Sequence, residues 1–213
     1  MPMGNKTNES LVYQYNDNLQ KKGIVVTYSN RLFIVAATAS VYFALYQTNL
    51  ILFGALNFSH RVDWVFLPSG LRLTFVLLFA LDGAIGIMLA STLLTYFLYF
   101  DGSYLNLFIT GALGGLAPLL ARKIAIDHLK LDENLLNLDA NGLFKVSVLF
   151  AIISPLVHQL WYFWTGRTEN FLTSTAVMMV GDWFGTVLVL ASLGLLLRWL
   201  KSAVAKVKAN TTK

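Results

Sequence analysis

The run from residue 64 to residue 100 decides the fold, and it reads WVFLPSGLRLTFVLLFALDGAIGIMLASTLLTYFLYF. Its only charged residues are Arg72 and Asp82. A helix that crosses a bilayer needs about 20 predominantly apolar residues, so this run is too long for one crossing. Leu81-Asp82-Gly83 interrupts it, and two helices of roughly 17 residues joined by a tight turn at that tripeptide would fit its length.

The rest of the chain repeats this apolar character. Hydrophobic residues make up 56% of the 213 residues and charged residues 13%, about half of the roughly 25% that a soluble domain carries. Further apolar runs cover about residues 32–57, 104–121, 144–165 and 171–199. The fold class predicted is therefore an all-α, polytopic membrane bundle of six transmembrane helices. Five helices are the alternative, if residues 64–100 form one helix.

The charged residues predict three regions and an orientation. Residues 1–31 form a polar N-terminal tail, residues 32–199 the membrane helical domain, and residues 200–213 a basic C-terminal tail. With six helices, the basic residues of both tails and of the 122–145 loop lie on one side of the membrane, which the positive-inside rule identifies as the cytoplasm. We therefore expect a multi-pass protein of the cell membrane with both termini cytoplasmic. No apolar signal-peptide core precedes the first long run.

Three ionisable residues fall inside the predicted membrane helices, namely Arg72, His158 and Asp182. Such residues are rare in membranes and usually face the interior of the bundle. Counted along their helices, all three lie roughly 10–17 Å below the outer surface. They could therefore meet at one level.

The neighbouring residues suggest a polar pocket at that level. Pro68-Ser69-Gly70 precedes Arg72 and predicts a second helix that is broken there or begins late. Trp161 shares a helix face with His158. We therefore predict a ligand-binding pocket lined by Ser69, Arg72, His158, Trp161 and Asp182. The alternative is that Arg72 and Asp182 only hold two helices together.

Two pairs of glycines have the four-residue spacing that allows helices to approach closely, namely Gly111 with Gly115 and Gly181 with Gly185. Motifs of enzymes are not found, so we expect no catalytic residues. The chain has no cysteine, and we expect neither a metal site nor a cofactor. The net charge of +5 is explained by cytoplasmic loops, so we expect no nucleic-acid partner.

Two motifs resemble a known family. Trp64-Val-Phe-Leu-Pro68-Ser69-Gly70-Leu71, followed by an apolar helix and a glycine-containing turn, is similar to the proline-serine-glycine segment of bacterial membrane-associated sensor (MASE-type) domains. Gly181-Asp182-Trp183-Phe184-Gly185 resembles the signature of that family's final helix. The resemblance covers roughly residues 32–199 and implies a helical bundle of the bacterial inner membrane that senses a signal in or through the membrane.

The chain departs from the family in two ways. Family members are commonly fused to cytoplasmic signalling domains, whereas a short basic tail follows the last apolar run here. The proline that usually follows the final-helix signature is missing, and Ala191-Ser192 stands in its place. The resemblance therefore implies a stand-alone sensor whose output is carried by a partner protein.

Three functions remain open from the sequence. The first is an integral membrane sensor or ligand-binding module, with an unknown small ligand, that signals through a partner protein. The second is a substrate-binding component of a membrane transporter, because transporters use broken helices with polar groups near the midplane. The third is a membrane scaffold or assembly protein.

Overall fold

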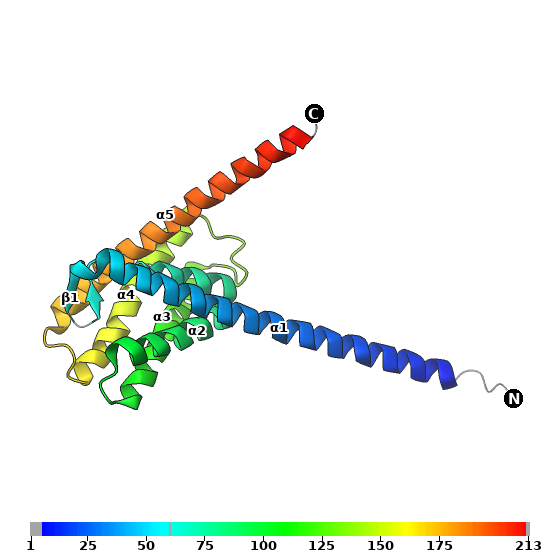
Figure 1. The fold of residues 1–213 in the computed structure, drawn as a ribbon, viewed down its shortest axis with the longest axis horizontal. Helices are drawn as coiled ribbons and strands as arrows, with labels where there is room; N and C mark the ends of the chain where they lie inside the picture. The colour runs from blue at the N-terminus through cyan, green and yellow to red at the C-terminus, as the bar shows by residue number, and fades with distance from the viewer. Residues whose placement is uncertain (1–5, 60, 212–213) are drawn as a thin grey trace.

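The structure of this chain, a computed structural model, describes residues 6–59 and 61–211, with side chains from residue 27 to residue 204. It is a bundle of helices with one short β-hairpin (Figure 1). The elements in chain order are α1 (Lys6–Phe53), the 3-10 helix η1 (Gly54–Leu56), β1 (Asn57–Ser59), β2 (Val62–Asp63), α2 (Pro68–Tyr99), α3 (Tyr104–Leu129), α4 (Ala140–Trp164) and α5 (Phe171–Thr211). The strands β1 and β2 pair in antiparallel fashion.

The all-α membrane class is confirmed. Five helices of the described chain are long and apolar enough to cross a membrane. Large apolar side chains cover the outside of the bundle, as at Phe33, Ile51 and Leu172, whereas Arg72 and Asp182 are buried inside it. Lipid is the solvent that suits an apolar exterior around a partly polar core.

Helix α2 is folded back on itself. Ala80 lies at φ 47° and ψ −117°, outside the helical region. Gly83 lies directly against the carbonyl group of Phe75, although residues eight positions apart in a straight helix are about 12 Å apart. Residues 68–79 and 81–99 therefore form two arms of a helical hairpin.

This geometry corrects two details of the sequence prediction. The break lies at Ala80, just before Leu81-Asp82-Gly83, and it leaves arms of unequal length. Of the two alternatives at Pro68-Ser69-Gly70, the structure shows a late start and no break, because these residues form the first turn of α2. Proline suits that position, since its missing N–H would have no partner in the first turn and its fixed φ is already helical.

The two arms of α2 run in opposite directions beside α1. Hydrogen bonds join them to α1 at three levels: Leu67 N to Asn49 Oδ1 (2.9 Å), the hydroxyls of Tyr46 and Tyr99 (2.9 Å), and Arg31 Nη2 to Asp82 Oδ1 (2.8 Å). The first arm thus runs from the level of Asn49 towards that of Arg31, and the second arm returns. Six crossings would require this arrangement, and the number of crossings stays a prediction.

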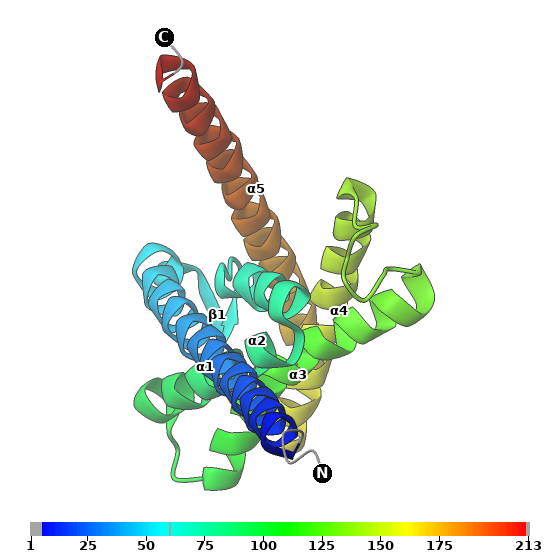
Figure 2. The same ribbon diagram turned by 90° about the vertical axis from the view of Figure 1, so that its right-hand side faces the viewer.

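The bundle has two distinct ends. One end, here called the hairpin end after the β-hairpin, holds β1, β2 and the loops 100–103 and 165–170. At the opposite end, here called the tail end, α1 and α5 leave the bundle as long single helices that diverge from each other (Figures 1 and 2). The residues of the predicted N-terminal tail that the structure describes, from Lys6 onward, thus continue the first membrane helix.

Candidate functional site

Arg72 and Asp182 form a buried ion pair between the first arm of α2 and the first third of α5. Arg72 Nη2 lies 3.2 Å from both carboxylate oxygens of Asp182, and the side chains are 3% and 0% exposed. The guanidinium carbon lies 5.3 Å from the ring centre of Phe66 and 5.4 Å from that of Phe150. The aromatic faces attract the cation.

Ser69 lies next to this pair and links the two helices that carry it. Its Oγ lies 2.7 Å from the carbonyl oxygens of Phe66 and Asp182 and 3.2 Å from Thr186 Oγ1. The serine therefore joins the first turn of α2 to the same turn of α5 that carries the carboxylate. Arg72, Asp182 and Ser69 form one connected polar group in the core.

The glycines of α5 make room for a loop, and not for a neighbouring helix as we expected. A Cβ atom at Gly181 would overlap the carbonyl group of Asp63, and one at Gly185 would overlap that of Phe66. Phe66 N donates to the carbonyl oxygen of Gly181 at 3.2 Å. The segment between β2 and α2 therefore lies in direct backbone contact with α5, beside Asp182.

The glycines of α3 do face a helix. A Cβ atom at Gly111 would overlap Thr92, and one at Gly115 would overlap the carbonyl group of Ala84. Both contacts lie on the second arm of α2. These glycines set how closely α3 approaches that arm, and they take no part in the polar group.

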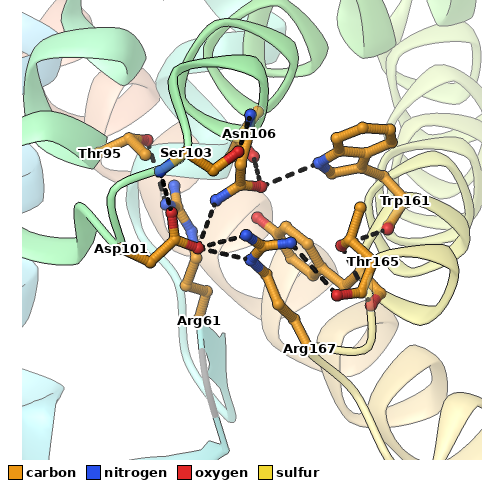
Figure 3. A network of polar contacts seen from close by, with 10 residues as sticks. Arg61, Thr95, Asp101, Ser103, Asn106, Trp161, Thr165 and Arg167 are labelled. Carbon is orange, nitrogen blue, oxygen red and sulfur yellow. Dashed lines mark hydrogen bonds and ion pairs between the residues drawn. The ribbon is translucent and has the colours of Figure 1, made fainter.

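The two predicted residues of α4 have different surroundings. His158 is buried, and its Nδ1 lies 2.7 Å from the carbonyl oxygen of Ser154. It lines a cavity of about 40 Å³ together with Arg72. Trp161 does not line this cavity; its Nε1 donates to Asn106 Oδ1 at 3.0 Å (Figure 3). Four of the five predicted residues therefore lie at the ion pair or line the cavity beside it, namely Ser69, Arg72, His158 and Asp182. Trp161 belongs to another network.

That second network closes the hairpin end. Arg167, after α4, binds Asp101, before α3, through Nε at 2.9 Å and through Nη2. Asn106 Nδ2 also donates to Asp101, at 3.3 Å. The hydrogen bonds from Arg167 hold the pKa of the Asp101 carboxyl below its usual 3.8. The sequence analysis missed this network, because polar residues in loops carry no signal of their partner.

Arg61 is a further residue that the sequence analysis left in a loop. It lies at φ 59° in the hairpin connection and turns its side chain inward. Its Nη1 donates to Thr95 Oγ1 at 3.0 Å (Figure 3), and its guanidinium carbon lies 4.5 Å from the ring centre of Tyr99. Arg61 lines the same cavity as Arg72 and His158. Two arginines therefore line this small space.

The site can hold charge and water. Among the residues with described side chains, no group of three His, Cys, Asp or Glu could hold a metal ion. The cavity is far smaller than the roughly 300–1,000 Å³ of a pocket for a drug-sized ligand. It has room for a few waters or a small ion.

Comparisons with known proteins leave this site to be interpreted from its own geometry. No family model matches the chain, and neither a curated protein nor a solved structure matches it, so the likeness to MASE-type domains rests on its two short motifs alone.

Proposed function

We propose that this protein is an integral membrane sensor or ligand-binding module that signals through a partner protein. The observation that carries the proposal is the place of Asp182. This buried carboxylate is paired with Arg72 in the core of the bundle, and it belongs to the same unbroken helix that leaves the bundle at the tail end.

A continuous helix is a stiff connection between these two places. From Asp182 to Thr211, α5 continues for 29 residues without a break in its helical structure, which corresponds to about 43 Å. A ligand that competes for Arg72 would alter the force that holds α5 against α2. Small shifts of packed helices are a known means of transmitting such a change. The partner protein would contact the exposed residues of α5 at the tail end, which include Arg198 and Lys201.

The resemblance to MASE-type domains agrees with this proposal, because both of its motifs belong to the site. Ser69 is the serine of the proline-serine-glycine segment, and Asp182 is the aspartate of the final-helix signature. The two residues are joined by a hydrogen bond from Ser69 Oγ to the Asp182 carbonyl oxygen.

Movement of α5 can be measured directly because the chain has no cysteine. Single cysteines at Ser29 and Ser202, both exposed, would carry spin labels on α1 and α5. We expect Asp182→Asn to shift the distance between the labels by about 2 Å or more. The control Asp101→Asn changes a carboxylate of the hairpin end and should leave the distance unchanged. An unchanged distance in a folded Asp182→Asn protein would contradict the proposal.

A role in transport is the second candidate, and the buried polar group of Arg72, Asp182 and Ser69 favours it. Transporters hold their substrates with polar groups near the membrane midplane. Vesicles that contain the purified protein separate the two functions. Uptake of a solute that stops in Arg72→Gln would favour transport, whereas binding without uptake would favour sensing.

A further inference from the structure

The cavity between Arg61 and Arg72 lies in the centre of the bundle, and its chemistry can be deduced from its lining. Side chains of the hairpin end, of both arms of α2, of α3 and of α4 surround it, and its volume is about 40 Å³. About 10–15 Å³ are needed for each water-sized occupant. The cavity therefore has room for a small ion with one or two waters, and it is too small for a drug-sized organic ligand.

Two buried polar atoms in this lining have no partner within the described chain. They are Arg72 Nε and Ser91 Oγ, in residues that are 2% and 6% exposed. Arg72 uses Nη2 for Asp182, so its Nε is left over. Native proteins rarely leave a buried donor unsatisfied. An occupant of the cavity that accepts hydrogen bonds would satisfy both atoms.

Arg61 is the charged group of the lining that favours an anion as that occupant. Asp182 already balances Arg72. No carboxylate of the residues with described side chains lies within 4.0 Å of an Arg61 nitrogen in an ion pair. Among the residues with described side chains, Asp63 is the only acidic residue in the lining. It accepts a hydrogen bond from Asn57, and burial raises the pKa of its carboxyl above 3.8.

Tyrosine hydroxyls add further hydrogen-bonding groups to the lining. Tyr42, Tyr46 and Tyr162 line the same space, and a phenol O–H can donate to an anion. A buried anion is stable only where charged and polar donors replace its hydration shell, and charge-assisted hydrogen bonds from arginine are the strongest of these. From the size, the unpartnered donors and the charge, we propose that this cavity binds one small monovalent inorganic anion of the size of chloride, between Arg61 and Arg72.

This inference rests on the proposed sensor function and specifies its ligand class. An anion beside Arg72 competes with Asp182 for the same guanidinium. Binding would thus weaken the contact that holds α5 to α2, as the sensor mechanism requires.

Bromide is a suitable probe, with gluconate as the counter-anion because it is too large for the cavity. The full chain in lipid nanodiscs is titrated with sodium bromide replacing sodium gluconate at constant sodium, and the Tm is followed. We expect a saturable rise of Tm in the wild type. In Arg61→Gln the midpoint should shift upward by about tenfold or more, as for the loss of one charge-assisted hydrogen bond. The control Arg31→Gln, at the tail end, should respond like the wild type.

Ser91→Ala keeps the test informative if Arg61→Gln fails to fold. This variant removes one unpartnered donor, and we expect a higher bromide midpoint with the same maximal rise. A wild-type Tm that does not depend on bromide would overturn the proposal and leave water as the occupant. An unchanged midpoint in both Arg61→Gln and Ser91→Ala would overturn it too. If bromide has no effect but the label distance still responds to Asp182→Asn, only the anion site fails and the sensor proposal stands.

Discussion

Arg72 and Asp182 are separated by 110 positions in the chain, and yet one nitrogen of the guanidinium lies 3.2 Å from each carboxylate oxygen in the buried core of the bundle. A buried pair of this kind is weak support for stability, because removing two charges from water is costly. Breaking it by removing one partner is a different matter, since the other charge then stays buried and unpaired.

The first prediction follows from this asymmetry. Asp182→Asn leaves the Arg72 cation without its counter-charge and should destabilise the fold by about 3–5 kcal/mol. The double variant Arg72→Gln with Asp182→Asn removes both charges and should be closer to the wild type. Denaturation of the purified protein, analysed as a double-mutant cycle, measures the coupling. Additive effects would show that the residues do not interact. A stable and fully active double variant would favour the scaffold function.

The second prediction concerns the contact between α5 and the segment before α2. In Gly185→Ala the new Cβ would overlap the carbonyl group of Phe66, so the backbones must separate, at a cost of about 1–3 kcal/mol. Gly194→Ala is a matched control on the same helix, because no atom lies within 4 Å of its new Cβ. This control should be neutral or more stable, since alanine is the better helix former. Equal Tm values for both variants would contradict the close contact.

The third prediction tests the break in α2. Ala80 has a positive φ that glycine adopts without strain. Ala80→Gly should therefore be neutral or stabilising by up to about 1 kcal/mol. Ala191 lies on the exposed side of the regular helix α5, and Ala191→Gly should cost about 1 kcal/mol there. If thermal denaturation shows the same loss for both substitutions, α2 is not folded back at Ala80.

The fourth prediction is a pH dependence at the hairpin end. The Arg167 guanidinium lowers the pKa of Asp101 below 3.8 in the folded protein. The carboxyl therefore stabilises the fold above pH 3.8, and this contribution is lost as the pH falls through the folded-state pKa. The Tm difference between wild type and Arg167→Gln should be constant above about pH 5 and shrink in more acidic buffer. A difference that does not change with pH would show that the charge of Asp101 does not contribute to stability through Arg167.

The fifth prediction concerns topology. Under the six-crossing arrangement, the tail end faces the cytoplasm because the basic residues of the 122–145 loop and of both tails belong to it. Reporter fusions after Lys130 and Lys208 should both read cytoplasmic, whereas a fusion after Gly102 in the hairpin-end loop should read external. A Lys208 fusion on the external side would exclude six crossings. It would also invalidate the argument that Arg72, His158 and Asp182 lie at a common depth in the membrane.

The sequence by itself determined that this is a helical membrane protein and which residues had to lie in its interior. Apolar runs of sufficient length and the scarcity of charge are properties of each residue in its solvent, and they can be summed without knowing any partner. The same reasoning placed Arg72 and Asp182 inside the bundle, because a charge that faces lipid is costly wherever it lies in the chain. Pro68 likewise indicated a local feature of the second helix, which proved to be its first turn.

Only the tertiary structure decided which groups meet. Trp161 binds Asn106 and not the core pair, Arg61 turns inward from a loop to the cavity, and Gly181 and Gly185 receive a loop and not a helix. The position of the fold-back, at Ala80 and not at the neighbouring glycine, also depends on how the two arms pack. These features arise from contacts between segments far apart in the chain, whose geometry depends on the packing of all the helices together. Composition and local spacing do not identify which distant segments will be in contact.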